Sequence, residues 1–526
     1  MSEADVLVVG YGPVGQVLSI LLAQRGWRVT VVERWPRPYP MPRAVAFDSE
    51  AGRILAEAGV GAHLAEFGEP SGEYSWQNGA GDVLLHIDAS PLGRCVWPDS
   101  TSMYQPGLEA ALSRRAELLP NLRVRRGCEV VGLHEEADAV RVDIRAGDGE
   151  LTRVSARWVV GCDGANSTVR RYLPEGSVDF GFAHDWLICD TVVRDGRPFR
   201  PNNLQVCDPA RPRTAVSAGP GHRRWEFMLL DGEDPEEFDT EGHAWRLLEL
   251  FGITPDNAVL KRHAVYRFQA RLARHWRAGR LLIAGDAAHL MPPFAGQGMC
   301  SGFRDAANLA WKLDTVLGGR AGAPLLDTYA AERSAHVRHA ITMSVNLGKV
   351  ICLTDPRAAA DRDVSMLTAR ERGLSAGQPR AAVQALTAGL LRRTGGNRIP
   401  PAGQLSPQGR VARGTRTGLF DDLVGYGFVL LCREEPRQLL DEPAAAVLDH
   451  LGAHVVHLVP PGAAPADPDA VVDLDGVYLP YLAETRSVAV LVRPDFYVFG
   501  GAREATGVAA LVRDLADQLA LARTAA

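Results

Sequence analysis

The chain has 526 residues, of which 46% are hydrophobic and 23% charged, and its formal net charge is −6. A chain of this length and composition has material for about three globular domains of ~150 residues each. The negative balance and the lack of a basic run argue against nucleic acid as a partner. No uncharged apolar run reaches the ~18 residues that a membrane-spanning helix needs, so we expect no membrane association.

Eight cysteines are scattered along the chain without a CxxC pair. This spacing predicts neither a zinc site nor a redox dithiol, and we expect no metal. Met1-Ser2-Glu3-Ala4-Asp5 lacks the basic residues that open a signal peptide. The sequence therefore predicts a cytoplasmic protein with reduced thiols.

The first predicted strand and helix are joined by a glycine pattern that is typical of dinucleotide-binding domains. Asp5–Val9 reads as a buried strand, Gly10-Tyr11-Gly12-Pro13-Val14-Gly15 fits GxGxxG, and apolar residues then recur at helical spacing. The first glycine turns the chain, the second lets the backbone approach a pyrophosphate, and the third lets helix and strand pack closely. The next strand, Val29–Val32, ends at Glu33, whose carboxylate would bind a ribose 2′-hydroxyl and repel a 2′-phosphate. The pattern therefore predicts FAD or NAD, and not NADP, at this position.

A second glycine-rich loop, Gly285–Gly298, follows the apolar run Arg280–Ala284 and precedes a predicted helix at Met299–Leu317. Two glycines near its end let the backbone approach a ligand closely. The free N–H groups of the helix start favour electron-rich oxygens, and Asp286 can accept hydrogen bonds from hydroxyls. The loop is thus a plausible seat for a polyol chain attached to a polar ring. The alternative is an ordinary glycine-rich turn with a capping aspartate.

Asp48, near the start of the segment between these loops, is one further polar candidate. Trp35–Pro42 is rich in proline and cannot form a helix. A helix is predicted at Glu50–Ala58 with Ser49 as its N-cap. Local capping is the plain alternative to any chemical role for Asp48.

Residues 72–100 read as loop and short strand, and a helix is predicted to open at Tyr104–Glu109. Strands are predicted at Cys128–His134 and Ala139–Ala146, with a hairpin turn at Gly147-Asp148-Gly149. A further buried strand is followed by Cys162-Asp163-Gly164 and a helix that Ser167 is predicted to cap.

From Val178 to about Phe268 short strands dominate, with a helix near Gly242–Phe251, which predicts an antiparallel sheet that covers a substrate. A long helix is predicted at Asp327–Leu353, a linker at Gly395-Gly396-Asn397, and a separate α/β unit from Pro400 onward. The predicted domains are residues 1–177 and 271–395 for the nucleotide-binding part with its long helices, 178–270 for the substrate part, and 400–526 for the C-terminal unit.

Three separated signals occur together: GxGxxG with Glu33, Cys162-Asp163-Gly164, and Gly285–Gly298. Over about residues 1–350 they resemble the class A flavoprotein aromatic hydroxylases, a family of FAD-dependent monooxygenases. The tail, with Gln408-Gly409-Arg410-Val411 and Arg493–Gly500, looks like the thioredoxin-like C-terminal domain of the phenol hydroxylase branch, without a CxxC pair. The whole is most similar to 3-(3-hydroxyphenyl)propionate hydroxylases and polyketide-tailoring hydroxylases. The resemblance implies a mixed α/β and α+β fold, in which an FAD-binding Rossmann-type (βαβ) domain is interrupted by an antiparallel-sheet substrate domain.

The resemblance also implies a cofactor site, with no second GxGxxG because the family binds NAD(P)H only transiently. The implied FAD contacts are Gly10, Gly12, Pro13 and Gly15 with the pyrophosphate, Glu33, Arg34 and Val130 with the adenosine, Arg43, Gln105 and Asp286 with the pyrophosphate and ribityl chain, Asp163 with both FAD and the nicotinamide nucleotide, and Pro293, Gly296, Gln297, Gly298 and Met299 with the isoalloxazine ring.

The implied reaction hydroxylates a small phenolic or polycyclic aromatic substrate with NAD(P)H and O₂ through a C4a-hydroperoxyflavin. Such chemistry asks for a general base that takes the phenolic proton and for exclusion of water. Asp48 and Tyr266 match substrate-facing positions of the phenol hydroxylase branch, although Tyr266 is also explained by plain packing. Baeyer–Villiger oxidation or epoxidation of a polyketide-type substrate is the alternative activity, and a flavin-bearing binding protein is a third reading. The expected assembly is a monomer or homodimer.

Overall fold

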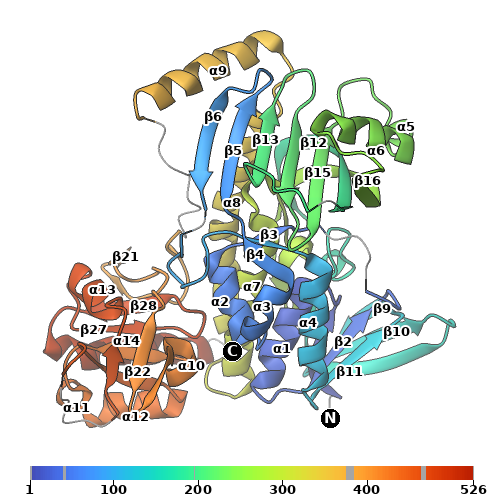
Figure 1. Cartoon of the computed structure of the whole chain (residues 1–526). Coiled ribbons are helices and arrows are strands. Elements are labelled where there is room, and N and C mark those ends of the chain that lie inside the picture. Colours follow the sequence, from blue (N-terminus) through green and yellow to red (C-terminus); the bar gives the residue numbers. More distant parts are fainter. Residues whose placement is uncertain are drawn as a thin grey trace.

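The central sheet of the nucleotide-binding part is built around the first strand of the chain (Figure 1). The computed structural model describes residues 3–38, 43–89, 91–194, 196–374, 384–463 and 469–524. β1 (Ala4–Val9) runs parallel to β2 (Val29–Glu33) on one side and to β11 (Leu151–Gly161) on the other, and α1 (Pro13–Gln24) connects β1 to β2. The strand is buried throughout, as expected for a parallel strand covered on both faces. The remaining strands of this sheet are β8 (Leu122–Arg126), β9 (Cys128–Glu135), β10 (Val140–Ala146), β17 (Arg277–Ala278) and β18 (Leu281–Ile283).

The predicted strands and first helix are confirmed, but one predicted turn joins a different pair of strands. Gly147–Gly149 connects β10 to β11, which pair antiparallel, whereas β9 and β10 are joined through residues 136–139. The expectation failed because β11 extends back to Leu151, with half-exposed polar residues alternating along its first half. Residues 39–42 of the proline-rich segment lie outside the described residues.

The second sheet forms the upper part of the molecule in Figure 1 and draws strands from three stretches of the chain. Its order is β19-β16-β12-β15-β14-β13-β5-β6, and all neighbours are antiparallel except β13 and β5, which are parallel. The sheet is therefore mixed, and it is not confined to residues 178–270. Its strands are β5 (Glu73–Asn78), β6 (Val83–Asp88), β12 (Ser177–Val193), β13 (Asn203–Cys207), β14 (Arg213–Ser217), β15 (His222–Met228), β16 (Ala258–Ala273) and β19 (His289–Leu290).

The two faces of this sheet pack on different layers. Trp225 and Phe227 point to one side and form a core with α6 (Glu241–Leu248). Met228 points to the other side because side chains alternate along a strand, and there it packs with Trp186 and with Ile351 at the end of α8. This second face looks toward the helices of the nucleotide-binding part.

The long helices of the centre are close to those expected from the sequence. α7 (Gln297–Leu317) and α8 (Asp327–Ile351) confirm two predicted helices, and α9 (Pro356–Glu371) follows them. The shorter elements are α2 (Ser49–Glu57), α3 (Leu64–Phe67), α4 (Gln105–Glu117), α5 (Pro235–Phe238) and the three-stranded sheet of β3 (Ala46–Phe47), β7 (Thr101–Met103) and β4 (Gly68–Pro70).

The C-terminal unit, orange to red in Figure 1, has a seven-stranded sheet of order β23-β22-β26-β25-β24-β27-β28. The four predicted strands and two predicted helices are present, but β22, β23 and β26 are additional. Gly395 and Gly396 form the turn of a small hairpin and not an open linker. The elements are β20 (Arg393–Thr394), β21 (Asn397–Arg398), β22 (Arg410–Arg413), β23 (Arg416–Leu419), α10 (Phe420–Val424), β24 (Val429–Cys432), α11 (Pro436–Leu439), α12 (Glu442–Leu451), β25 (His454–Val459), β26 (Val471–Asp473), α13 (Tyr478–Glu484), β27 (Ala489–Val492), β28 (Val498–Ala502) and α14 (Val508–Thr524).

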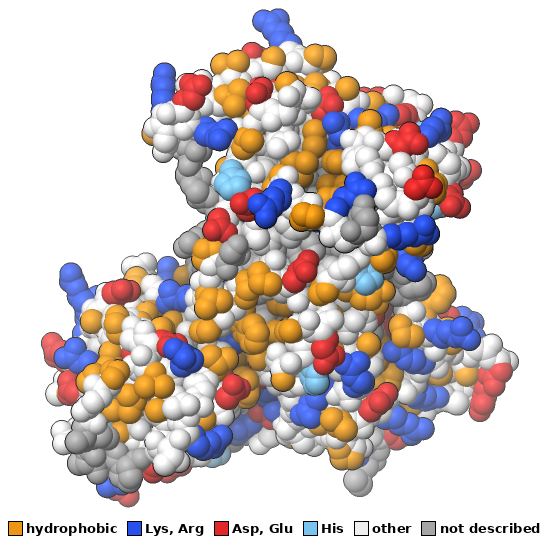
Figure 2. Space-filling model, in the orientation of Figure 1, with side chains coloured by type: hydrophobic (Ala, Val, Ile, Leu, Met, Phe, Trp, Pro, Cys, Tyr) orange, Lys and Arg blue, Asp and Glu red, His pale blue; other side chains and the backbone are white. Residues whose placement is uncertain are grey.

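The surface carries both signs of charge. On the face drawn in Figure 2, acidic and basic side chains are interspersed, in keeping with 57 basic and 63 acidic residues in the chain. Among the helices in the described part of the chain, none combines the length and the apolar character that a bilayer span requires.

Candidate active site

The GxGxxG loop leaves open space beside only its second glycine. Gly10 has φ +99°, and a Cβ there would lie 2.5 Å from the carbonyl oxygen of Cys162. A Cβ on Gly15 would lie 2.2 Å from the carbonyl oxygen of Gly10, whereas a Cβ on Gly12 would meet no heavy atom within 4 Å. Gly12 is also the N-cap of α1, whose first N–H groups can receive an anion. Gly10 and Gly15 thus serve close packing of the backbone, and Gly12 faces open space that suits a pyrophosphate.

The carboxylate of Glu33 is fixed at the end of β2 by backbone amides. Its two oxygens accept hydrogen bonds from the N–H groups of Tyr11 and Trp35, each over 2.8 Å. Arg34 is exposed and places its guanidinium 5.4 Å from the Trp35 ring, while Val130 is buried in the core. Of the three residues predicted to surround the adenosine, Glu33 is the one with a polar group held in place by other segments.

Asp163 has one satisfied and one free carboxylate oxygen. Its Oδ2 accepts hydrogen bonds from the N–H groups of Thr168 (2.6 Å) and Val169 (3.2 Å). Its Oδ1 is buried and has no hydrogen-bond partner among the described residues. Ser167 Oγ accepts a hydrogen bond from the Arg170 N–H, but the N-cap of the short 3₁₀ helix Val169–Tyr172 is Thr168 and not Ser167 as predicted. A buried acceptor without a donor fits a ligand hydroxyl or amide at this place.

Three predicted cofactor residues from distant segments meet at one point. Arg43 Nη1 donates to Asp286 Oδ2 over 2.9 Å, and Gln105 Oε1 accepts from the backbone N–H groups of Arg43 and Ala44, each over 2.8 Å. The Arg43 and Asp286 side chains are 53% and 36% exposed, so both can reach a ligand. The structure therefore brings together the residues predicted for the pyrophosphate and ribityl chain.

A buried charge network beneath this point was not predicted. Asp305 of α7 accepts hydrogen bonds from the Gly285 N–H (3.1 Å) and from Arg333 Nε (2.8 Å), and its Oδ2 lies 2.7 Å from Nε2 of His289. Burial favours the neutral acid, but His289 and Arg333 together lower the pKa of Asp305. The network fixes the backbone just before Asp286. The sign of this network in the sequence is Asp305 itself, an aspartate in the middle of a helix that is otherwise buried.

The loop predicted to line the isoalloxazine ring runs from a 3₁₀ turn, Pro293–Ala295, into α7. Gly296 has φ +63°, and a Cβ on it would meet no heavy atom within 4 Å. A Cβ on Gly298 would approach only Met291, at 3.9 Å. The side chain of Gln297 is turned back into the protein, where it accepts from Arg304 Nη1 over 3.0 Å. The loop therefore offers bare backbone to a planar ligand.

Asp48 caps α2, which corrects the expectation that Ser49 would be the cap. Asp48 Oδ1 accepts from the Ala51 N–H over 2.9 Å, and Ser49 Oγ instead accepts from the Cys95 N–H. Asp48 Oδ2 accepts from Arg304 Nη2 over 2.6 Å and from Gln297 Nε2 over 3.1 Å. Burial acts against the charged form, but Arg304 and these hydrogen bonds hold the pKa of Asp48 below its ordinary value.

A cavity of about 1110 Å³ lies between residues 293–297, the second sheet and the C-terminal unit. We call residues 293–297 the ring loop, because they are predicted to line the isoalloxazine ring. Asp48 lines it, and Tyr266 is not among its described lining residues. The Tyr266 hydroxyl accepts from Arg262 Nη1 over 3.0 Å, and its ring packs in the apolar cluster around Trp186, so the structure does not bring this predicted residue to the cavity. The lining includes Asp48, Glu50, Tyr74, Trp76, Leu85, Ile87, Asn203, Val216, Pro293–Gln297, Met343, Leu347, Gln404, Leu405, Tyr481, Glu484 and Thr485.

The C-terminal unit contributes part of the cavity wall, which the sequence did not indicate. Arg94 donates to the carbonyl oxygen of Leu405 over 2.8 Å and places its guanidinium 5.1 Å from the ring of Tyr481. All three residues line the cavity. This unit therefore closes one side of the cavity as well as forming a domain of its own.

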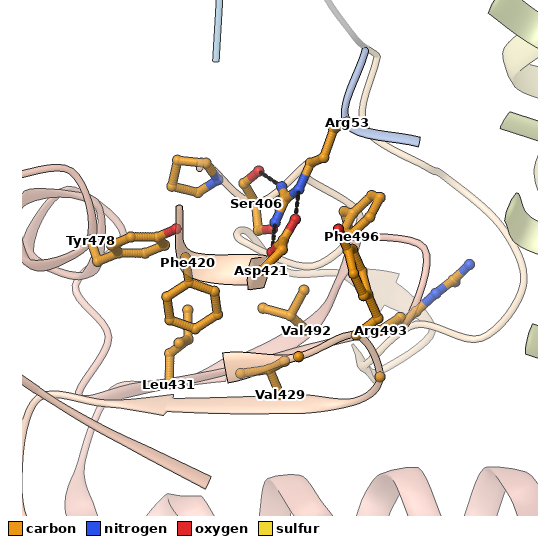
Figure 3. Close-up of a pocket in the computed structure, with 14 residues that line it drawn as sticks. Arg53, Ser406, Phe420, Asp421, Val429, Leu431, Tyr478, Val492, Arg493 and Phe496 are labelled. Carbon is orange, nitrogen blue, oxygen red and sulfur yellow. Dashed lines mark hydrogen bonds and ion pairs between the residues drawn. The ribbon is translucent and has the colours of Figure 1, made fainter. Parts of the chain in front are cut away.

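A buried ion pair anchors the C-terminal unit to α2. Figure 3 shows the Arg53 guanidinium directed at the carboxylate of Asp421, with a bidentate contact of 2.7 and 2.8 Å. A further donor of Arg53 reaches the Ser406 carbonyl oxygen at 3.0 Å, and the guanidinium lies 4.0 Å from the ring of Phe496. The same helix starts at the cavity with Asp48, so α2 links the cavity to the C-terminal unit.

Fold and site together define a flavin-type dinucleotide-binding protein, with a ring loop that borders a large cavity of mixed apolar and polar lining. The sequence profile described as FAD binding domain matches residues 3–344, and the one described as HcaD C-terminal domain matches residues 403–518. The chain is 39% identical over 521 residues to the probable NADH-specific resorcinol 4-hydroxylase of Rhodococcus jostii (strain RHA1), which covers 98% of this chain and 95% of that protein. It is 35% identical over 474 residues to the 3-(3-hydroxy-phenyl)propionate/3-hydroxycinnamic acid hydroxylase of Mycobacterium avium (strain 104), covering 87% of this chain and 81% of that protein.

Solved structures show the same architecture over the full length. Aklavinone-11 hydroxylase in complex with FAD and aklavinone superposes with a TM-score of 0.78 at 25% identity, covering 98% of this chain and 99% of that one. The flavin-dependent monooxygenase PieE superposes with a TM-score of 0.80 at 23% identity over the same shares of the two chains, which shows the fold. The chain belongs to the FAD-binding family of aromatic hydroxylases and is an FAD-dependent monooxygenase.

Proposed function

We propose that the protein hydroxylates a monocyclic phenol of the resorcinol type with NADH and O₂. The observation that carries this proposal is the cavity that borders the loop Pro293–Gln297, whose lining combines aromatic and aliphatic side chains with hydroxyl, amide and charged groups. The choice of a monocyclic phenol and of NADH is supported by the relative from Rhodococcus jostii, named for resorcinol and NADH, which matches nearly the full length. The cytoplasmic location and the monomeric or homodimeric state stay predictions from the sequence.

The residues in place fit FAD, as judged from three features of the structure. Gly12 faces open space at a helix start, Asp163 Oδ1 is a buried acceptor without a donor, and Gly296 leaves its backbone uncovered. We assign the pyrophosphate to the GxGxxG loop, the adenosine ribose to Glu33, and the ribityl chain to Asp286. Bound FAD, once reduced by NADH, would activate O₂ so that one of its two oxygen atoms can be transferred to the substrate. The protein's own tasks are to hold the phenol against the ring loop, to exclude water, and to manage the phenolic proton.

Exclusion of water is supported by the walls of the cavity. Phe294 of the ring loop lies edge-on to Trp186 and Phe268, with ring centroids 5.8 and 6.2 Å apart. Trp76 and Leu85 continue this apolar wall on the sheet, and Tyr481 and Leu405 close the side formed by the C-terminal unit. Such a wall protects a reactive oxygen species from water and strengthens every polar contact inside it.

The volume of about 1110 Å³ supports a second candidate, a polycyclic phenol. Aklavinone-11 hydroxylase is crystallised with such a substrate. The two candidates differ in whether the wall formed by the C-terminal unit touches the substrate, because a single ring held at Phe294 has no need to reach Tyr481.

The test is a panel of resorcinol, 3-(3-hydroxyphenyl)propionate and a tetracyclic phenol, scored by NADH and NADPH consumption and by product structure. We expect resorcinol to stimulate NADH oxidation and to yield a trihydroxybenzene. A ring-expanded or epoxidised product would instead support the alternative oxygen insertion. Ligand binding without any stimulated NADH oxidation would contradict the enzymatic proposal, and preference for the tetracyclic phenol would select the second candidate.

A further inference from the structure

The described lining of the cavity contains one buried hydrogen-bond donor that is not used within the protein. Trp76 of β5 lines the cavity and is 3% exposed. Its indole N–H is buried and meets no acceptor among the described residues. No other described residue of the lining has a buried side-chain nitrogen or oxygen atom without a partner. A buried donor of this kind calls for an explanation, and its place in the cavity wall allows a ligand to supply the acceptor.

A second donor stands beside it on the same face of β5. Tyr74 lies two residues before Trp76, lines the cavity and is half-buried. The two rings are edge-on, with centroids 6.4 Å apart. Burial raises the pKa of the Tyr74 hydroxyl and the nearby Trp76 N–H acts to lower it, although the two groups do not have the geometry of a hydrogen bond. An indole N–H can only donate, and the Tyr74 hydroxyl keeps its proton at neutral pH, so both groups are donors.

Three serine hydroxyl groups extend this row of donors. Ser71, Ser100 and Ser102 line the cavity, and Ser71 Oγ lies 2.8 Å from the Oγ atom of Ser100 and 3.0 Å from that of Ser102. These two hydrogen bonds use two of the three hydroxyl hydrogens, so one hydrogen is left for another acceptor. The serines adjoin Tyr74, because Asn203, its neighbour across β13 and β5, donates to the Ser71 carbonyl oxygen over 2.7 Å.

The row of donors carries no charge. We call its five residues the donor strip: Ser71, Tyr74, Trp76, Ser100 and Ser102. The one positively charged side chain in the described lining, Arg94, instead lies 5.1 Å from the ring of Tyr481 in the C-terminal unit. A carboxylate is bound most strongly by a charged donor. The donor strip therefore suits an uncharged oxygen atom with free lone pairs.

The donor strip is connected to the ring loop at both of its ends. Ser102 on β7 pairs with Ala46 on β3, and Asp48, two residues further on, accepts from Gln297 of the ring loop over 3.1 Å. At the other end, Trp76 belongs to the apolar cluster against which Phe294 of the ring loop packs. An aromatic ring that packs on the ring loop therefore has the donor strip within reach.

We propose that the donor strip binds an uncharged oxygen atom of the substrate, namely the second hydroxyl group of a 1,3-dihydroxybenzene, and so selects diphenols. This inference rests on the proposed hydroxylase function and specifies its substrate class. The substrate oxygen accepts hydrogen bonds from Tyr74, from Trp76 and from the serine group. A methyl group at the same position has no lone pairs, so it would leave these donors buried without an acceptor, which opposes binding.

Resorcinol and 3-methylphenol separate this contact from general packing, because they differ in one hydroxyl group and are similar in size. Each is titrated into FAD-loaded protein without NADH, and the flavin absorption spectrum reports binding. Wild-type protein should bind resorcinol about five- to a hundredfold more tightly. Equal affinity for the two phenols, or a preference for 3-methylphenol, would overturn the inference.

The Tyr74→Phe and Trp76→Phe variants each remove one donor and keep an aromatic ring in the wall. Each should lower the preference for resorcinol over 3-methylphenol by about three- to tenfold. Comparing both phenols in every variant isolates the contact with the second hydroxyl group. A variant that loses affinity for the two phenols to the same extent would show a merely structural role and overturn the inference.

Trp97→Phe is the matched control. The Trp97 N–H is also buried without a partner among the described residues, but Trp97 is not part of the described lining. This variant should keep the wild-type preference, and a loss as large as that of Trp76→Phe would overturn the inference. If a thermal melt shows that Trp76→Phe does not fold, Tyr74→Phe decides, because it removes a hydroxyl group only.

Turnover separates this inference from the proposed function. Selective binding of resorcinol without any hydroxylated product would support the donor strip and overturn the proposed function. Hydroxylation of resorcinol with an unchanged preference in Tyr74→Phe and Trp76→Phe would support the proposed function and overturn the role of the strip.

Discussion

Arg304 of α7 donates to Asp48 Oδ2 over 2.6 Å and to Glu50 Oε2 over 2.6 Å, and this contact ties the start of α2 to the ring loop. Gln297, the first residue of α7, bonds to both Asp48 and Arg304. The carboxylate of Asp48 thus orders the loop beside the cavity. Its hydrogen bond with Arg304 gives Asp48 an anchoring role, and its role as a general base stays a prediction.

The Asp48→Asn variant tests this anchoring role. Asparagine still caps a helix well, so the main loss is one charge-assisted hydrogen bond to Arg304, worth about 1.5–3 kcal/mol. The folded-state pKa of Asp48 lies below 3.8, so its contribution is present above that pH and disappears as the pH falls through the folded-state pKa. Denaturation curves at neutral and at acid pH should show a stability gap to wild type that closes in acid. A stable but fully uncoupled variant would instead restore Asp48 as the general base.

The Gly12→Val variant should fold normally and fail to bind FAD. Gly12 has φ −74° and ψ −179°, which valine adopts readily, and its Cβ would enter open space. The side chain would then fill the place assigned to the pyrophosphate. The matched control is Gly15→Ala, whose Cβ would collide with the Gly10 carbonyl oxygen and should lower the melting temperature. Full FAD occupancy in a folded Gly12→Val protein would contradict the assignment of this loop.

The Asp286→Ala variant should lose FAD affinity and keep its stability. The Arg43–Asp286 pair is exposed, and pairs of this kind contribute at most about 1 kcal/mol to folding. A lost hydrogen bond to the ribityl chain should weaken FAD binding or turnover by about ten- to a hundredfold, or 1.5–3 kcal/mol. FAD titration of the apoprotein measures the first quantity, and a thermal melt measures the second. Wild-type affinity would place the ribityl chain elsewhere.

The cofactor residues predicted from the sequence depend mainly on local backbone. Glu33 and Asp163 lie at or just after strand ends, and Gly12 and Gly296 lie at helix starts, where a short stretch of sequence determines the geometry. Arg43, Gln105 and Asp286 were found by resemblance, and the structure places them in contact.

The substrate part could not be predicted, because its residues meet only through the tertiary fold. The wall formed by Leu405 and Tyr481 depends on docking of the C-terminal unit. The role of Tyr266 stays a prediction, because a tyrosine on a half-buried strand gives no sign of which neighbour bonds its hydroxyl, here Arg262.

A buried charge cluster predicts how the protein responds to acid. Glu332 of α8 accepts hydrogen bonds from Lys312 (2.8 Å), Asn308 (2.7 Å) and Arg493 (2.7 Å). Burial opposes the charge, but Arg493 and Lys312 outweigh it and lower the pKa of Glu332 to about 2. The stabilisation is therefore complete above pH 4.5 and is lost as the pH falls toward about 2. Acid titration followed by circular dichroism should show this loss in wild type and a flatter curve in Glu332→Gln, and equal curves would contradict the assignment.

The last prediction concerns the joint between α2 and the C-terminal unit. Arg53 and Asp421 are 3% and 8% exposed, so removing one charge leaves the other buried without its partner. The Arg53→Met and Asp421→Leu variants should each lose about 3–5 kcal/mol of unfolding free energy, and the double variant should lose much less than their sum. A urea-denaturation cycle of the four proteins measures this coupling. Because α2 also carries Asp48, the single variants should in addition loosen the cavity and release more hydrogen peroxide per NADH, with the double variant close to wild type. Additive losses of stability would show that the two residues do not act as a pair, and unchanged peroxide release would show that the joint serves folding alone.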